Sequence, residues 1–153
     1  MDISELVASV RDAQIWTPDK LLDAYGSSAA FAADLAGTND KKSNAYKAAL
    51  RNVQRWRQGT RRPNKATQEK LNQLGKKRFA PKGKGVTLDG FIRVNGSGKP
   101  RKRAININLN DEEWQQMQEQ ALNDDVDGFM DTLAEAYGVE SIEMEEGDAE
   151  LNE

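Results

Sequence analysis

The sequence contains no cysteine and no histidine among its 153 residues. Without cysteine the chain can form no disulfide and offers no thiolate to a metal, and without histidine it has no imidazole ligand and no imidazole general base. These two absences exclude zinc fingers, zinc hydrolases and Ser-His-Asp hydrolases. The carboxylates of Asp124-Asp125-Val126-Asp127 lack the glycine and the distant glutamate of a calcium loop. We therefore expect a protein that is not an enzyme and that uses no cofactor and no metal.

Long apolar runs are missing as well. No stretch approaches the roughly 18 apolar residues that indicate a membrane-spanning helix, and the opening residues Met1-Asp2-Ile3-Ser4-Glu5 lack the basic and then apolar order of a secretory signal. Hydrophobic residues make up 37% of the chain, which is below the share in an ordinary globular domain and predicts small cores. We expect a cytoplasmic protein without membrane contact.

Charge of one sign is nearly absent from two long stretches. Residues 41–103 hold 20 basic and 2 acidic side chains, whereas residues 104–153 hold 16 acidic side chains and no basic one. Residues 1–40 hold 2 basic and 7 acidic side chains, so the segments carry −5, +18 and −16 in chain order within a net charge of only −3. This segregation predicts a polyanion as the partner of the middle segment. It also allows a basic protein partner for the acidic end.

The order of apolar patterns predicts an α+β fold that is mainly α. Apolar residues recur at helical spacing in five segments of the first half, namely 3–14, 18–25, 29–36, 41–58 and 67–74. The second half shows period-two alternation in 86–94 and 105–109, joined by a predicted hairpin loop. Two further helices are expected after Asn110 and over 128–138.

These patterns divide the chain into four parts. We expect a helical domain at residues 1–75, ended by Gly75, and a basic linker rich in glycine and proline at residues 76–85. Residues 86–138 are expected to form a hairpin-and-helix lobe that dimerises. Residues 139–153, acidic and poor in apolar residues, are expected to be a mobile tail.

The segment 41–58 has two faces of different character. At 100° per residue its apolar side chains fall on one side, and basic and amide side chains fall on the other. The apolar side consists of Tyr46, Ala49, Leu50, Val53 and Trp56. The other side suits the major groove of DNA, where arginine recognises guanine and asparagine or glutamine recognises adenine. The candidate base-contacting residues are Asn44, Lys47, Arg51, Asn52, Gln54 and Arg55.

Further basic residues flank this helix at its ends and in the following turn. Lysine and arginine at such positions more often contact phosphates than bases. The candidate phosphate contacts are Lys41, Lys42, Arg61, Arg62 and Lys65. The alternative is a solvated basic face on an ordinary helical domain, but the excess of 20 basic over 2 acidic residues favours nucleic acid. Double-stranded DNA is favoured over RNA, because the clustered aromatic strands of an RNA-recognition domain are missing.

The same part of the chain resembles a known DNA-binding family. The stretches Ala29–Gly37, Val53-Gln54-Arg55-Trp56-Arg57-Gln58-Gly59-Thr60-Arg61-Arg62-Pro63 and Leu71-Asn72-Gln73-Leu74-Gly75 are similar to the Cro and lambda-repressor type of helix-turn-helix. The resemblance implies a DNA-binding domain in which the alanine-rich helix braces a recognition helix that ends at Gly59. Residues Asn39–Leu50 depart from the family by adding roughly two helical turns between these helices.

A second resemblance lies further along the chain. The run Arg101-Lys102-Arg103-Ala104-Ile105-Asn106-Ile107-Asn108-Leu109, followed by Asp111-Glu112-Glu113-Trp114 and two short helices, is similar to a ribbon-helix-helix unit. In that family two strands pair across a dimer and outward strand side chains enter the major groove. The resemblance implies a candidate second DNA contact with Arg103, Asn106 and Asn108 outward, within the set Arg101, Lys102, Arg103, Asn106 and Asn108. The alternative, favoured by the additional strand before this run, is a lobe that only dimerises.

The order of a helix-turn-helix, a basic linker, a hairpin and paired helices is also distantly similar to the terminal proteins of linear actinobacterial plasmids and chromosomes.

We expect a dimeric, sequence-specific double-stranded DNA-binding protein of the nucleoid, which regulates transcription as a repressor or maintains a plasmid or phage replicon. One alternative is a protein that binds the telomere, origin or centromere of a replicon. Another is a non-specific architectural protein whose acidic tail competes with DNA for the basic segment.

Overall fold

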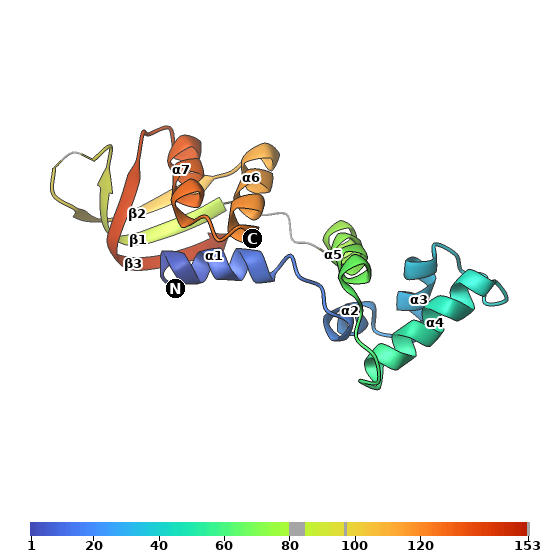
Figure 1. Ribbon diagram of the computed structural model, residues 1–153. Coiled ribbons are helices and arrows are strands. Elements are labelled where there is room, and N and C mark those ends of the chain that lie inside the picture. Colours follow the sequence, from blue (N-terminus) through green and yellow to red (C-terminus); the bar gives the residue numbers. More distant parts are fainter. Residues whose placement is uncertain (80–84, 97, 153) are drawn as a thin grey trace. The chain divides into compact units, whose positions relative to one another are not determined.

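The computed structural model describes residues 1–79, 85–96 and 98–152. These residues form seven helices and one three-stranded antiparallel sheet (Figure 1), which confirms the predicted α+β, mainly α fold. In chain order the elements are α1 (Ile3–Asp12), α2 (Pro18–Tyr25), α3 (Ser28–Ala36), α4 (Asn44–Arg57), α5 (Lys65–Phe79), β1 (Gly85–Val94), β2 (Arg101–Asn108), α6 (Asp111–Leu122), α7 (Val126–Tyr137) and β3 (Ile142–Asn152).

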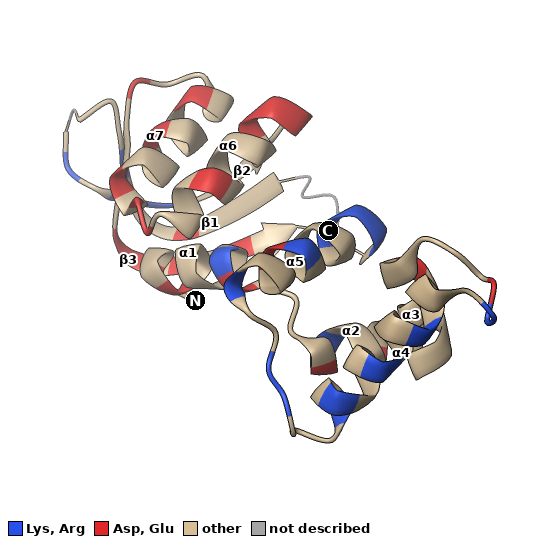
Figure 2. Ribbon diagram, turned by 45° about the vertical axis from the view of Figure 1, so that its right-hand side comes forward, with Lys and Arg blue, Asp and Glu red and all other residues tan. Residues whose placement is uncertain are grey.

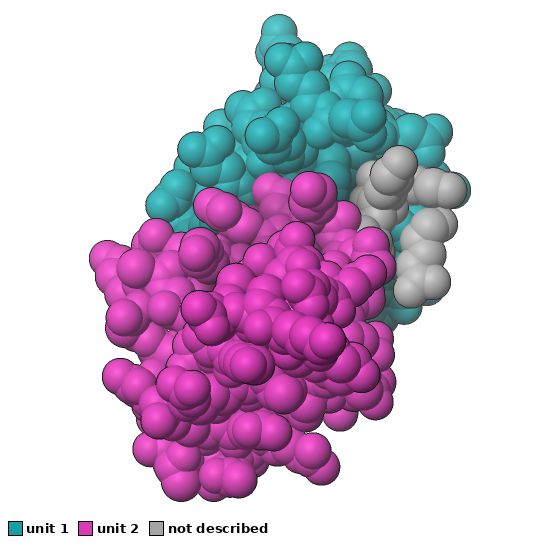
Figure 3. Space-filling model, turned by 90° about the vertical axis from the view of Figure 1, so that its right-hand side faces the viewer, with its two compact units in different colours: residues 1–13, 81–153 teal, residues 14–80 magenta. Residues whose placement is uncertain are grey.

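The chain divides into two compact units that do not follow the expected boundaries. Unit 1 consists of residues 1–13 and 81–153, and unit 2 consists of residues 14–80 (Figure 3). Unit 2 is therefore an insertion between α1 and β1. The sequence pattern places α1 in the helical domain, which is wrong, because an amphipathic helix shows that it has a buried face but not which core buries it.

Side chains fix the starts of the four helices of unit 2. Thr17, Ser27 and Ser43 each accept a hydrogen bond, at 3.3, 3.1 and 3.1 Å, from the backbone N–H three residues further on, in the first turns of α2, α3 and α4. Asn64 does the same for α5 at 2.8 Å. Each N-cap satisfies a backbone donor that the helix itself cannot pair. Left-handed glycines end α2 and α3.

The core of unit 2 receives a large, fully buried side chain from each of its helices. These are Leu21, Phe31, Val53 and Leu71. Burial of such a side chain contributes about 1.5–3 kcal/mol to stability. The helix α3 packs against α4, and the Phe31 ring centroid lies 6.1 Å from that of Trp56. In unit 2, α3 thus braces α4.

Trp16 connects the segment before α2 to α5. Its backbone N–H donates to Asn72 Oδ1 at 2.8 Å, and its carbonyl accepts from Gln68 Nε2 at 2.9 Å. Its ring packs near Phe79 and against Gly75. The expectation that Gly75 ends this helix is wrong, because α5 continues to Phe79. Gly75 lies within the helix because the Trp16 ring occupies the space of a side chain.

Unit 1 is built on a sheet with the strand order β2-β1-β3. The predicted hairpin is present, since β1 and β2 pair antiparallel from Gly85 opposite Asn108 to Ile92 opposite Arg101. Side chains on one face of the sheet are buried with residues of α1, α6 and α7 in a single core. Residue 97 of the predicted loop and residues 80–84 of the predicted linker lie outside the described residues.

The acidic C-terminal segment is not a mobile tail. Residues 142–152 form β3, which pairs antiparallel with β1 over its whole length. Ile142 and Ala149 of β3 are buried in the core of unit 1. The carboxylates of this segment are therefore carried on an edge strand of the sheet.

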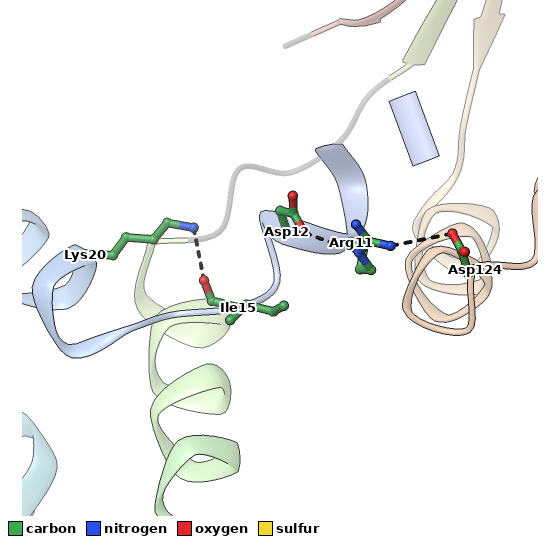
Figure 4. Close-up of polar contacts among 5 residues, drawn as sticks. All are labelled: Arg11, Asp12, Ile15, Lys20 and Asp124. Carbon is green, nitrogen blue, oxygen red and sulfur yellow. Dashed lines mark hydrogen bonds and ion pairs between the residues drawn. The ribbon is translucent and has the colours of Figure 1, made fainter. Parts of the chain in front are cut away.

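The helix α1 packs into the same core through Leu6, Val7 and Val10. At the end of this helix, Arg11 lies 3.2 Å from the Asp12 carboxylate and 3.5 Å from that of Asp124 (Figure 4). The ion pair with Asp124 joins the end of α1 to the segment between α6 and α7 within unit 1.

Candidate nucleic-acid interface

The helix α4 has one buried and one exposed face, as its pattern predicts. Tyr46, Ala49, Val53 and Trp56 are buried in the core of unit 2. Leu50, predicted to lie with them, is half-buried. Because residues at these spacings share one side of a helix, the opposite side is left to solvent.

The predicted base-contacting residues lie on this opposite side with one exception. Figure 2 shows lysine and arginine along α4. The exposed members of the set are Asn44, Lys47, Arg51, Gln54 and Arg55. Asn52 is half-buried and lines a hollow together with Trp56, so it lies apart from the others.

The basic residues of α4 form no ion pair with a carboxylate among the described residues. Among the residues that the structure describes, the basic side chains in ion pairs are Arg11, Arg78 and Arg93, none of which belongs to α4. In unit 2 the described pair joins Arg78 to Asp34 at 3.4 Å. The positive potential of α4 is therefore directed at the solvent and would attract an anion there.

A hydrogen-bonded turn before α4 carries the first two predicted phosphate contacts, Lys41 and Lys42. Asp40 Oδ1 accepts from the Lys42 backbone N–H at 3.0 Å, and the Asp40 carbonyl accepts from Ser43 Oγ at 2.8 Å. Because Ser43 then caps the helix, α4 begins at Asn44, later than its pattern predicts. Both lysines are exposed beside the helix start.

A second turn, at Gly59, follows α4. Gly59 adopts φ +73°, and the Thr60 backbone N–H donates to the Arg55 carbonyl at 3.1 Å. A left-handed residue with such a bond is a common helix terminus. The helix thus ends next to the glycine that the resemblance implies, and the chain continues into Arg61 and Arg62, which are exposed.

Arg61 and Arg62 line a shallow hollow of about 370 Å³ beside α4. Asn64 and Thr67 also line this hollow, and Asn64 Oδ1, which caps α5, accepts a hydrogen bond from the Thr67 backbone N–H. Two guanidinium groups beside a helix start favour an anion, and Lys65 is exposed in this first turn. The sequence pattern did not single out Asn64 and Thr67, although an asparagine before a helical segment is an N-cap signal. The remaining lining residues are Asn52, Trp56 and Pro63.

The five predicted contacts on β2 do not share a face. Because side chains alternate along a strand, Lys102, Asn106 and Asn108 lie on the open face of the sheet. Arg101 and Arg103 lie on the face that bears the buried isoleucines. The prediction that Arg103 points the same way as Asn106 is therefore wrong.

The open face of the sheet is also unfavourable to phosphate. Thr87 Oγ1 and Asn106 Oδ1 lie 2.8 Å apart, and Asn152 Nδ2 donates to Thr87 Oγ1 at 2.9 Å, so this side chain of β2 is held within the sheet. The neighbouring strand β3, which pairs with β1, carries Asp148 and Glu150 on this same open face. Their charge repels a nucleic-acid backbone.

Comparisons with models of protein families, with curated proteins and with solved structures gave no match to the chain. None of the described helices is long and apolar enough to cross a membrane. The described part of the chain also contains no group of three or more acidic side chains arranged to hold a metal ion. Function is therefore inferred from the geometry and charge of unit 2.

Proposed function

We propose that the protein binds double-stranded DNA in a sequence-specific manner through unit 2. The observation that supports this most is the exposed face of α4, where Lys47, Arg51 and Arg55 form a basic strip without carboxylate partners among the described residues. Val53 and Trp56 anchor the opposite face in the core. A rigid helix with an exposed basic face of this kind fits the major groove.

The side chains of unit 2 divide into two roles in this proposal. Arg51 and Arg55 each donate two hydrogen bonds to guanine, and Asn44 and Gln54 pair with adenine. Cations at the two ends of α4 contact phosphates and set the register of the helix on the duplex. These cations are Lys41, Lys42, Arg61, Arg62 and Lys65.

Unit 1 pairs two copies of the chain, so that two α4 helices bind two half-sites of one DNA site. A dimer of this kind serves as a regulator of transcription or as a maintenance protein of a plasmid or phage replicon, in the nucleoid. The proposal includes no catalytic step and no cofactor.

Selection of bound duplexes from a random pool tests this function. We expect the recovered duplexes to share a motif with two half-sites whose centres lie about one helical turn apart. A variant with Lys47, Arg51 and Arg55 all replaced by alanine is expected to recover no motif. Unrelated sequences recovered by the unchanged protein would contradict sequence-specific reading, and failure to retain any duplex would contradict DNA binding itself.

A further inference from the structure

The strand β2 has an outer edge with which no described segment pairs. It lies at one side of the sheet, with β1 as its described neighbour. An edge strand presents unpaired backbone N–H and C=O groups, and proteins usually protect it with charged side chains, proline, a bulge or a covering segment. The stretch 104–108 of β2 contains no charged residue and no proline. This edge is open to a further strand.

The other edge of the sheet, on β3, is protected in three ways. It carries five carboxylates in eleven residues. Its pairing with β1 is irregular between Phe91 and Ile92. The Ala149 backbone N–H already donates to the Met1 carbonyl at 2.6 Å, so a donor of this edge is in use. The two edges thus differ, and β2 is the one suited to association.

Charge along β2 indicates what would pair with it. The strand begins with the basic residues 101–103, and the acidic residues Asp111, Glu112 and Glu113 follow its end in the first turn of α6. In an antiparallel pair of identical strands, the start of one lies beside the end of the other. A second copy therefore places each basic start beside an acidic helix start. Pairing of β2 with the acidic edge β3 would instead leave two edges free and continue into a filament.

We propose that β2 pairs antiparallel with β2 of a second copy of this chain, which joins two sheets into one of six strands. In the register that places Asn106 opposite itself, Ile105 lies opposite Ile107 on the face that bears the helices. The same register places Arg101 beside the start of α6 of the second copy, where Asp111 lies. The contact is symmetric and closes at a dimer. It deepens and rests on the dimerisation part of the proposed function, and it does not need DNA.

Single cysteines test the pairing, because the chain contains no cysteine of its own. Directly opposite residues in antiparallel strands lie close enough for a disulfide. Under mild oxidation of the full chain without DNA, Asn106→Cys is expected to form a covalent dimer. Glu150→Cys, which is exposed on the same sheet face but on β3, is the matched control and is expected to stay monomeric on a non-reducing gel. A cross-link in Glu150→Cys and none in Asn106→Cys would overturn the proposal, and a stronger cross-link in Ala104→Cys would overturn the register.

Charge reversal tests the Arg101–Asp111 contact. Arg101→Glu and Asp111→Lys are each expected to raise the dissociation constant of the dimer about tenfold, because each contact occurs twice and becomes repulsive. The double variant is expected to regain the original constant, which a role in folding alone would not produce. Sedimentation equilibrium without DNA measures the dissociation constants of the two single variants and of the double variant. A monomeric unchanged chain, or no recovery in the double variant, would overturn the proposal, whereas loss of DNA binding with an intact dimer would overturn the DNA-binding function alone.

Discussion

Gly75 of α5 lies in direct contact with the indole ring of Trp16. A Cβ atom added at Gly75 would come within 2.1 Å of Trp16 Cγ, far inside van der Waals contact. The backbone of Trp16 is itself bonded to Gln68 and Asn72 of the same helix, so the ring has little room to move away. The absence of a side chain at one position thus lets the segment before α2 attach to α5.

Gly75→Ala is expected to destabilise unit 2 by about 1–3 kcal/mol, the usual effect of overpacking. This direction is opposite to the helix propensities, which favour alanine over glycine. Unfolding in urea followed by tryptophan fluorescence measures the change. Gln73→Ala, at an exposed position of the same helix, is the control and should leave stability nearly unchanged. An equal or higher free energy of unfolding in Gly75→Ala would contradict the contact.

Arg51→Ala and Arg55→Ala are each expected to weaken binding to the selected duplex by about 1–3 kcal/mol, with a much smaller effect on random duplexes. Arg61→Ala is expected to weaken binding to both kinds of duplex. It should also reduce the slope of log affinity against log salt concentration by about one, as loss of a phosphate contact does. Fluorescence anisotropy over a range of salt concentrations measures these quantities. Lys20→Ala removes the same charge from α2, where Lys20 lies 4.2 Å from the Trp16 ring, and is the control. Equal losses on both kinds of duplex would contradict base reading by α4.

Deletion of residues 139–152 is expected to unfold unit 1. It removes β3, which pairs with the whole of β1 and buries Ile142 and Ala149 in the core. Loss of the thermal transition of unit 1 in circular dichroism, with the transition of unit 2 kept, is the expected result. A truncated chain with an intact unit 1 would contradict the strand assignment.

Competition between carboxylates and DNA is better tested by substitutions that keep the strand. Glu145 and Glu146 are exposed on β3, and their replacement by glutamine removes charge without removing backbone pairing. The double variant is expected to bind random duplexes more tightly at low salt and equally at high salt, because salt screens the repulsion. Affinities that are unchanged at both salt concentrations would show that the β3 carboxylates do not compete with DNA.

Tyr25→Phe is expected to alter the stability of unit 2 at high pH. Burial and the hydrogen bond from Tyr25 Oη to the Asp34 carboxylate, 2.6 Å long, raise the pKa of Tyr25 above the ordinary 10.0. A pKa raised by folding gives stabilisation that is complete below pH 10 and is lost as the pH rises through the folded value. The variant is expected to lose about 1 kcal/mol at neutral pH and to decline less steeply above pH 10. Urea unfolding at neutral pH and above pH 10 measures the free energy of unfolding of both proteins. An equally steep decline of this free energy in Tyr25→Phe and in the unchanged protein would contradict the prediction.

The parts of the fold that depend on neighbouring residues could be predicted from the sequence. The two faces of α4 follow from the spacing of Tyr46, Ala49, Val53 and Trp56, and a cap such as Thr17 marks a helix start. The hairpin of β1 and β2 joins strands that are adjacent in the chain. The position of Gly75 inside α5 was not predictable, because its partner Trp16 lies far away in the sequence.

The strand β3 escaped prediction because its apolar alternation changes phase. Ile142 and Met144 contact the core from even-numbered positions, whereas Ala149 and Leu151 do so from odd-numbered ones. A register shift against β1 separates these two pairs. With five carboxylates in the same segment, no single period-two pattern remains to indicate a strand. The candidate DNA interface was more predictable, because it lies on one helix and its two flanking turns.

The insertion of unit 2 between α1 and β1 has a consequence for synthesis. The helix α1 is translated before unit 2, whereas its partners α6, α7 and β3 are translated after unit 2. Because chains are made at about 5–20 residues per second and domains fold as units, unit 2 is complete while α1 still lacks a core. A message broken before the codons of β3 would yield a folded unit 2 attached to an amphipathic helix whose apolar face lacks its core. Synthesis of β3 is thus the step that allows unit 1 to complete its core.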